Sequence, residues 1–219
     1  MIRIIIIGEG PTEQGFCNDV LQSVFNAQDK YIETPKIKKS QGGIVHWSNL
    51  KKQIELHLKN TSVYVTTFLD YYGIKSKHEF PKWEEAKAIV NKSERITFLE
   101  QAMLEDIDES VRYRFIPYLQ LHEFEGLLFS DISVIEEYFD DDEFNDHDYL
   151  IKTDSTFDNP ENINDGKKTA PSKRLDRIIE EYSKVVYGSL LAQEIGLDKI
   201  REKCPRFNTW IEKLLAFEE

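Results

Sequence analysis

Two short apolar runs constrain the fold of this 219-residue chain more than any other feature. The first, Ile4 to Ile7, consists only of β-branched residues and stops at Gly8. The second, Val63 to Leu69, is almost as apolar and stops at Asp70. Runs without polar alternation are typical of strands that are buried on both faces, as in the middle of a parallel sheet. The sequence therefore predicts an α/β fold with a mainly parallel sheet.

Segments with apolar residues at helical spacing separate these runs and follow them. We expect helices over residues 13–25, 47–58, 82–91 and 93–107, and further strands over 31–38 and 113–121. Pro117 lies inside the last of these strands and indicates an edge position or a bulge, because proline cannot donate to a neighbouring strand. Residues 122–125 are predicted to open another helix. The helices are expected to flank the sheet.

The chain after about residue 130 lacks buried strand patterns and contains an acidic segment followed by helical patterns. Residues 136–148 include eight acidic residues among thirteen without a consistent period, which predicts a solvated loop. A helical tail is expected from Thr169, with Pro205 at the start of the last helix. We therefore expect one domain over 1–219, with a core over about 1–130 and an acidic loop and helical extension over 131–219.

Composition indicates which cellular compartment and which binding partners to expect. Forty acidic residues against 28 basic ones give a net charge of -12, which argues against broad coating of a nucleic-acid backbone. Cys17 and Cys204 are far apart, so neither a disulfide framework nor a zinc site is indicated. The apolar run at residues 4–7 is too short for a signal peptide or a membrane span. These features predict a cytoplasmic protein with no membrane partner.

Carboxylates follow both buried strands. Glu9 and Glu13 lie in the turn after the first strand, and Asp70 comes directly after the second. Because ligands of α/β sheets bind at the carboxyl ends of the strands, Glu9 and Asp70 are expected to lie close together there. Their oxygens suit a hard cation such as Mg²⁺ or Mn²⁺.

Two alternatives apply to the first turn. Glu9 and Glu13 would also favour a helix start through the helix dipole without binding anything. The spacing Gly8-x-Gly10 resembles part of a nucleotide-binding loop, but Glu9 would repel a pyrophosphate at that turn. The metal hypothesis is therefore preferred to the nucleotide hypothesis.

Four sequence blocks together carry a family resemblance. They are EGPTE at 9–13, FLDYYG at 68–73, LHEFEGLL at 121–128 and TAPSKRL at 169–175. In this order they resemble the bacterial domain-of-unknown-function family 4276, which is itself Toprim-like and related to overcoming-lysogenization-type Toprim nucleases. The resemblance implies a Toprim-like, Rossmann-like fold.

The resemblance also implies roles for individual residues. Glu9 matches the metal-organising glutamate of Toprim domains, and Asp70 matches the first residue of their Asp-x-Asp pair. Tyr72 stands where the second aspartate would be. The usual two-metal arrangement would therefore need a further oxygen ligand from Glu13, Glu123 or Glu125.

The block at 121–128 lies where a predicted strand passes into a helix. Either Glu123 or Glu125 is predicted to face the metal, and the alternative is that both belong to an ordinary acidic first turn. His122 is expected to be a hydrogen-bonded residue near the helix cap, since a hard cation has little need of imidazole.

The block at 169–175 places cations in the first turn of a helix, where the helix dipole disfavours them. Lys173 and Arg174 are therefore predicted to face an anion in the same cleft as Glu9, and the alternative for Lys173 is an ordinary surface salt bridge. Related Toprim nucleases use a lysine near the metals, and Lys173 resembles it. Lys167, Lys168, Lys173 and Arg174 form the predicted nucleic-acid-binding cluster.

These observations lead to two hypotheses. In the first, the chain is a metal-dependent nuclease in which Glu9 and Asp70 hold Mg²⁺ or Mn²⁺ and Lys173 stabilises charge on the phosphoryl group. The resemblance implies nucleic acid as substrate and an ABC-type ATPase as partner in bacterial defence against phage. In the second, favoured by Tyr72 and the acidic net charge, the chain is a catalytically inactive Toprim-like binding or effector subunit of such an ATPase system.

A third hypothesis has less support. A haloacid-dehalogenase-like phosphatase would use Asp70 as nucleophile, but this chemistry needs an acid two residues later, where the chain has Tyr72. The sequence leaves a homo-oligomer open.

Overall fold

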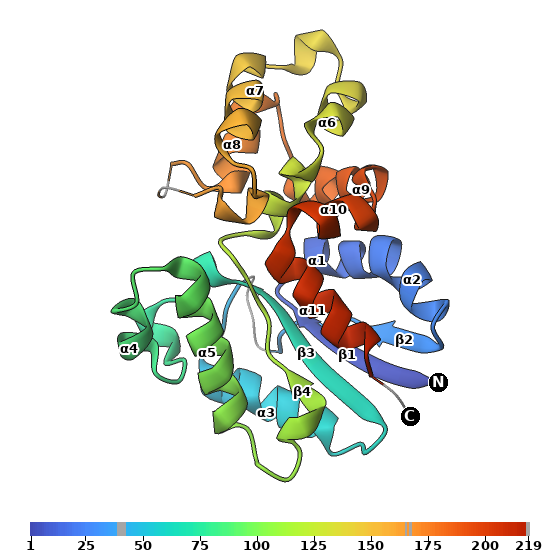
Figure 1. Cartoon of the computed structure of the whole chain (residues 1–219), viewed down its shortest axis with the longest axis vertical. Coiled ribbons are helices and arrows are strands. Elements are labelled where there is room, and N and C mark those ends of the chain that lie inside the picture. Colours follow the sequence, from blue (N-terminus) through green and yellow to red (C-terminus); the bar gives the residue numbers. More distant parts are fainter. Residues whose placement is uncertain (39–42, 165, 167, 218–219) are drawn as a thin grey trace.

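The sheet is parallel and its two longest strands lie in the middle. A computed structural model describes residues 1–38, 43–164, 166 and 168–217 (Figure 1). The strand order is β2-β1-β3-β4, with β5 also paired to β3, and all pairings between these strands are parallel. The strands are β1 Ile2–Gly8, β2 Lys30–Glu33, β3 Val63–Asp70, β4 Phe115–Ile116 and β5 Leu119–Gln120. The predicted α/β fold with a mainly parallel sheet is confirmed.

Both faces of β1 are covered, which explains its uniform composition. Ile4 and Ile6 belong to one apolar cluster, and Ile5 and Ile7 belong to a second cluster on the opposite face. Successive side chains of a strand point to opposite faces, so a strand between two cores needs apolar residues at every position.

Helices form a layer on each side of the sheet (Figure 1). Helices α3, α4 and α5 supply the cluster around Ile5, whereas α1, α2 and the helices after β5 supply the cluster around Ile4. The α-helices are α1 Pro11–Phe16, α2 Gln22–Asn26, α3 Trp47–Leu58, α4 Trp83–Lys87, α5 Lys92–Asp106, α6 Ile132–Tyr138, α7 His147–Thr156, α8 Pro171–Ile178, α9 Lys184–Ile195, α10 Leu197–Lys203 and α11 Pro205–Leu215. A π-helical segment, Cys17–Leu21, joins α1 to α2.

Short 3₁₀ helices fill several connections. They are η2 Tyr71–Gly73, η3 Ser76–His78, η4 Arg112–Arg114, η5 Phe124–Ser130, η6 Asp141–Glu143 and η7 Pro160–Asn162. Three of them adjoin the sheet, because η2 follows β3, η4 precedes β4 and η5 comes after β5. The helix predicted to open at residues 122–125 is thus a 3₁₀ helix. None of the helices in the described ranges combines the length and apolar character needed to cross a membrane.

The predicted strand over 113–121 is interrupted at Pro117. Its two halves, β4 and β5, both pair with β3, and β4 lies at the edge of the sheet. The edge position expected from Pro117 is confirmed. The strand expected over 31–38 is shorter than predicted and ends at Glu33, although Lys36 still bridges to Gly8.

The loop predicted over 136–148 is wrong at both ends. Helix α6 extends into it as far as Tyr138, and α7 begins within it at His147. Side chains explain the helix starts: Asp131 accepts a hydrogen bond from the Ser133 backbone N–H and Asp146 accepts one from Tyr149. Of these two caps, Asp146 lies in the predicted loop, so one of its acidic residues is a helix cap.

The last helix returns to the sheet instead of extending from it. The Trp210 ring of α11 stacks on Tyr118 with 4.5 Å between ring centroids, and its indole N–H donates to Thr66 Oγ1 on β3 at 2.9 Å. In Figure 1, α11 crosses over β1 and β3. The segment after residue 130 therefore shares its apolar core with β1.

Candidate metal site

Parallel pairing brings Glu9 and Asp70 together. Gly8 of β1 lies opposite Phe68 of β3, so the residues that follow leave the sheet side by side. The Asp70 backbone N–H donates to Glu9 Oε1 at 2.7 Å. The Asp70 Oδ1 atom in turn accepts from the Phe124 backbone N–H at 2.9 Å, which ties the end of β3 to η5. Both carboxylates are thus held by backbone groups at the carboxyl edge of the sheet.

A glycine lets the chain pass close to the Glu9 carboxylate. A Cβ atom added at Gly73 would lie 3.7 Å from both Glu9 carboxylate oxygens and 3.1 Å from Ile44 Cγ1. The turn η2 therefore leaves little room above Glu9, and a larger residue at position 73 would crowd the carboxylate.

Two further glutamates join this pair. Glu13 is buried, and its Oε2 atom accepts from the Gly10 backbone N–H at 2.8 Å, which caps the start of α1. Glu125 is completely buried, and neither of its oxygens accepts a hydrogen bond from a described residue. A buried carboxylate without hydrogen bonds is costly unless a cation or a proton compensates it. We call Glu9, Glu13, Asp70 and Glu125 the carboxylate cluster.

Burial and mutual repulsion raise the pKa values in the carboxylate cluster. Burial raises the pKa of Glu9 from 4.5 to about 7, and the charges of Glu13 and Glu125 add to the effect. Burial, followed by the charge of Glu9, raises the pKa of Asp70 well above its ordinary value, and burial also raises that of Glu125. These raised pKa values indicate that the negative charge of the carboxylate cluster is poorly solvated. A bound cation would reduce the repulsion among the carboxylates.

Lys184, the first residue of α9, supplies the basic group of the site. Its Nζ atom lies 3.5 Å from Glu125 Oε1. Burial alone would lower the pKa of Lys184, but the charges of Glu125, Asp70 and Glu13 outweigh it and raise that pKa. The sequence did not single out this residue. Its one sequence signal is the same as for Lys173, a cation in the first turn of a helix, and only the packing of α9 brings Lys184 to Glu125.

Close packing of α9 on α1 fixes the position of Lys184. A Cβ atom added at Gly188 would lie only 2.8 Å from Thr12 Cγ2 and 3.3 Å from the Phe124 ring. Only glycine permits this approach between the two helices. The start of α9 is thereby held over the turn that carries Glu13.

The described residues of the predicted basic cluster are not assembled around Glu9. The Lys173 side chain is 57% exposed and pairs with Asp176 at 2.5 Å, which is the surface salt bridge that the sequence left open. Lys168 is exposed, and Lys167 lies outside the described residues. Of the predicted cations that the structure describes, Lys168, Lys173 and Arg174, none is tied to the carboxylate cluster by an ion pair as Lys184 is.

The structure corrects the prediction that Arg174 belongs to a nucleic-acid-binding cluster. It is buried and donates to the Thr169 carbonyl oxygen at 2.8 Å, to the Tyr149 hydroxyl at 2.9 Å and to Thr153 Oγ1 at 3.1 Å. Its guanidinium also packs on the rings of Tyr149 and Phe157. Arg174 therefore joins α8 to α7 and is withdrawn from any nucleic acid at the surface.

Glu123 and His122 serve the local backbone. The Glu123 Oε2 atom accepts from the Ser172 backbone N–H at 3.1 Å and from its hydroxyl at 2.7 Å, so Glu123 holds the start of α8. His122 adopts a left-handed conformation with φ 70°, and its carbonyl oxygen accepts from the Tyr72 N–H at 3.1 Å. Burial lowers the pKa of His122 to about 3, which keeps the ring neutral. Of the two predicted glutamates, Glu125 is the one in the carboxylate cluster.

The chemistry of these residues fits a hard divalent cation. Glu9 and Asp70 are adjacent, poorly solvated carboxylates with fixed backbone partners. Within the described ranges, however, no three His, Cys, Asp or Glu side chains are grouped so that they could hold a metal ion by themselves. This arrangement suits Mg²⁺, which takes one or two carboxylates together with waters and substrate phosphates.

Glu9→Gln should stabilise the metal-free protein, and the gain should depend on pH. Between its unfolded pKa near 4.5 and its folded pKa near 7, Glu9 binds more protons in the folded state, so its contribution to stability falls as pH rises through this window. Gln keeps the acceptor for Asp70 N–H without the charge. In chelator, we expect the variant and the wild type to unfold with equal free energies at pH 4, and the variant to be roughly 1 to 3 kcal/mol more stable at pH 8.

Urea unfolding of both proteins at pH 4, 6 and 8 measures this difference. Comparing the two proteins cancels the opposite contribution of His122, whose lowered pKa makes stability rise between about pH 3 and 6.5. A gain that is the same at all three pH values would show that the Glu9 charge is not strained.

Comparisons with known proteins identify the family of the chain. Searches among curated proteins and among solved structures found no match. A family model described as Domain of unknown function (DUF4276) matches residues 8–215. The match includes every residue of the carboxylate cluster and Lys184. The chain therefore belongs to the DUF4276 family.

Proposed function

We propose that this chain is a metal-dependent nuclease of the Toprim type, with Mg²⁺ or Mn²⁺ held by Glu9 and Asp70. The observation that carries the proposal is the direct contact between these residues at the carboxyl edge of the sheet, with Glu125 and Lys184 beside them. A cluster of poorly solvated carboxylates next to one ammonium group is typical of a catalytic centre more than of a structural core.

The proposed roles follow from the contacts. Glu9 and Asp70 would hold the cation, and their backbone hydrogen bonds fix the direction of each carboxylate. When bound, such a cation polarises the scissile phosphate and favours ionisation of a bound water. Lys184 would neutralise charge that develops on the phosphoryl oxygens. Hydrolysis joins a water oxygen to phosphorus and breaks the bond to a sugar oxygen, which leaves with a proton.

Lys184 takes the role that the sequence assigned to Lys173. Lys184→Gln should lower the cleavage rate by about 10- to 100-fold, because removing one preorganised charge from a site typically costs this much or more. Lys173→Gln should change the rate by less than about threefold, since its partner Asp176 is on the surface. Rates on single-stranded and double-stranded substrates with Mn²⁺ measure both. A larger loss in the Lys173 variant would restore the sequence-based assignment.

A second candidate function is a catalytically inactive binding or effector subunit. Tyr72 in place of a second aspartate and the lack of a three-ligand group among the described residues favour it. In either case, an ABC-type ATPase as partner in defence against phage is a proposal that rests on the family resemblance. Assays with and without such an ATPase, in Mn²⁺ or chelator, separate the two candidates. A wild type that cuts nothing under any of these conditions favours the binding subunit.

A further inference from the structure

Three cavities adjoin along the N-terminal end of α5. The first, of about 340 Å³, is lined by residues of η2, and it shares Lys92 and Asn164 with the second, of about 500 Å³. The second shares Ser93 and Arg206 with the third, of about 460 Å³, between α5 and α11. We call the three together the α5 groove. The groove begins at Tyr71, the residue that directly follows Asp70.

The α5 groove gathers positive charge in a chain whose net charge is -12. Among the described residues that line it, one carboxylate, Glu100, stands against five cations, which are Lys87, Lys92, Arg95, Arg206 and Lys213. Lys87 pairs with Glu84, and Arg206 pairs with Glu100. The other three cations form no ion pair with a described carboxylate, so the groove keeps a positive charge. The N-terminus of the 15-residue helix α5 adds to it.

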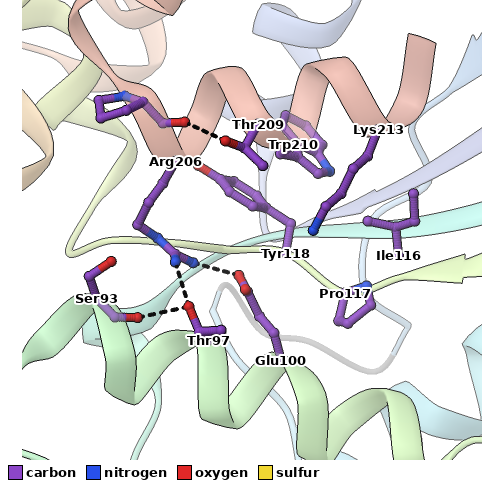
Figure 2. Close-up of a pocket in the computed structure, with 11 residues that line it drawn as sticks. Ser93, Thr97, Glu100, Ile116, Pro117, Tyr118, Arg206, Thr209, Trp210 and Lys213 are labelled. Atoms are coloured by element: carbon purple, nitrogen blue, oxygen red, sulfur yellow. Dashed lines mark hydrogen bonds and ion pairs between the residues drawn. The ribbon is translucent and has the colours of Figure 1, made fainter. Parts of the chain in front are cut away.

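The two ends of the groove differ in their lining. At the end nearest Asp70, the partly exposed rings of Tyr71 and Trp83 lie with 6.0 Å between their centroids. Figure 2 shows the other end, where Arg206 and Lys213 project from α11 toward α5. Partly exposed rings next to a row of cations are features with which proteins bind single-stranded nucleic acid, by stacking on bases and pairing with phosphates.

A buried amide in the groove has no acceptor among the described residues. Asn164 is 97% buried and lines the first two cavities. Its Oδ1 atom accepts from the Gly166 backbone N–H at 2.6 Å, but no described residue accepts a hydrogen bond from its Nδ2 atom. A buried donor without an acceptor costs stability, and an oxygen of a bound ligand would satisfy it.

We propose that the α5 groove binds single-stranded nucleic acid and leads it to Asp70. Unpaired bases would stack at Tyr71 and Trp83, and phosphates would follow Lys92, Arg206 and Lys213. A duplex hides the base faces that such stacking requires. Delivery to Asp70 rests on the proposed nuclease function, whereas binding in the groove does not.

The test measures binding without cleavage. Fluorescence anisotropy in chelator would follow oligothymidine, oligouridine and a duplex of equal length, each of about 20 nucleotides per strand. The variant Lys92→Glu/Lys213→Glu reverses two exposed charges in the groove. The matched control Lys52→Glu/Lys203→Glu makes the same change in net charge at exposed lysines of α3 and α10 that line none of the three cavities.

We expect the groove variant to bind single strands at least about tenfold more weakly and with a smaller salt dependence, and the control to bind within about twofold of wild type. Asn164→Asp retains the acceptor for Gly166 N–H and replaces the Nδ2 donor with an acceptor, so it should also weaken binding. Equal losses in the groove variant and the control, or tighter binding of the duplex, would overturn the proposal.

The outcomes also separate this proposal from the nuclease proposal. If the protein binds single strands through the groove but never cuts them, the groove proposal holds and the nuclease proposal is wrong. If the protein cuts but the groove variant binds like the control, the nuclease proposal holds and the groove proposal is wrong. The two single strands distinguish DNA from RNA as the natural ligand.

Discussion

Asp70→Asn is expected to reduce the proposed metal-dependent cleavage by at least about 100-fold while the protein stays folded. Asn keeps the oxygen that accepts from the Phe124 backbone N–H, so the tie between β3 and η5 persists. It loses the negative charge on which a hard cation depends. Because burial and Glu9 already disfavour the ionised form of Asp70, the metal-free variant should melt at a higher temperature than wild type at pH 8.

Two controls accompany this variant. Asp108→Asn makes the same chemical change at an exposed residue remote from the sheet edge and should leave cleavage unchanged. Asp70→Ala should lose the proposed activity and be about 1 kcal/mol less stable than Asp70→Asn, because the buried Phe124 N–H loses its acceptor. If Asp70→Asn cuts as fast as wild type in Mn²⁺, the metal-dependent mechanism is wrong.

Trp210→Ala is expected to have the largest effect on stability, a loss of about 3 to 5 kcal/mol. The ring is 2% exposed, stacks on Tyr118, and donates to Thr66 Oγ1. The substitution removes a large side chain from the core between α11 and the sheet and leaves a buried hydroxyl without its donor. Equilibrium unfolding in urea measures the loss.

Tyr113→Ala provides a matched control for Trp210→Ala. Tyr113 is 70% exposed, so its removal should change the free energy of unfolding by less than about 0.5 kcal/mol. A loss below about 1 kcal/mol for Trp210→Ala would mean that α11 is a peripheral extension, as the sequence suggested for the segment after residue 130.

The sheet was predictable from sequence because β1 and β3 are buried on both faces. Ile4 to Ile7 must satisfy two cores at once, and this leaves an unmistakable apolar run. The position of α11 was not predictable in the same way. An apolar stripe shows that a helix is packed on something, but it does not show which face of the sheet receives it.

The candidate site was also predictable only in part. The positions of Glu9 and Asp70 follow from parallel strands alone, and their contact agrees with that reasoning. Lys184 and Arg174 depend on how distant helices pack. The same pattern, a cation in the first turn of a helix, occurs at both, yet α9 packs on α1 and brings Lys184 to Glu125, whereas α8 packs on α7 and buries Arg174.

Titration of the protein with Mn²⁺ at pH 8 tests the central claim most directly, because Glu9 is ionised above its pKa of about 7. Electron paramagnetic resonance would count free and bound Mn²⁺ for the wild type, Glu9→Gln, Asp70→Asn and, as a control, Glu123→Gln, whose carboxylate holds α8. We expect the wild type and the control to bind Mn²⁺ with a Kd below about 1 mM. A Kd of this size corresponds to a favourable binding free energy of roughly 4 kcal/mol. Glu9→Gln and Asp70→Asn should bind at least about tenfold more weakly. Wild-type binding no tighter than that of Asp70→Asn would contradict a metal site at Glu9 and Asp70.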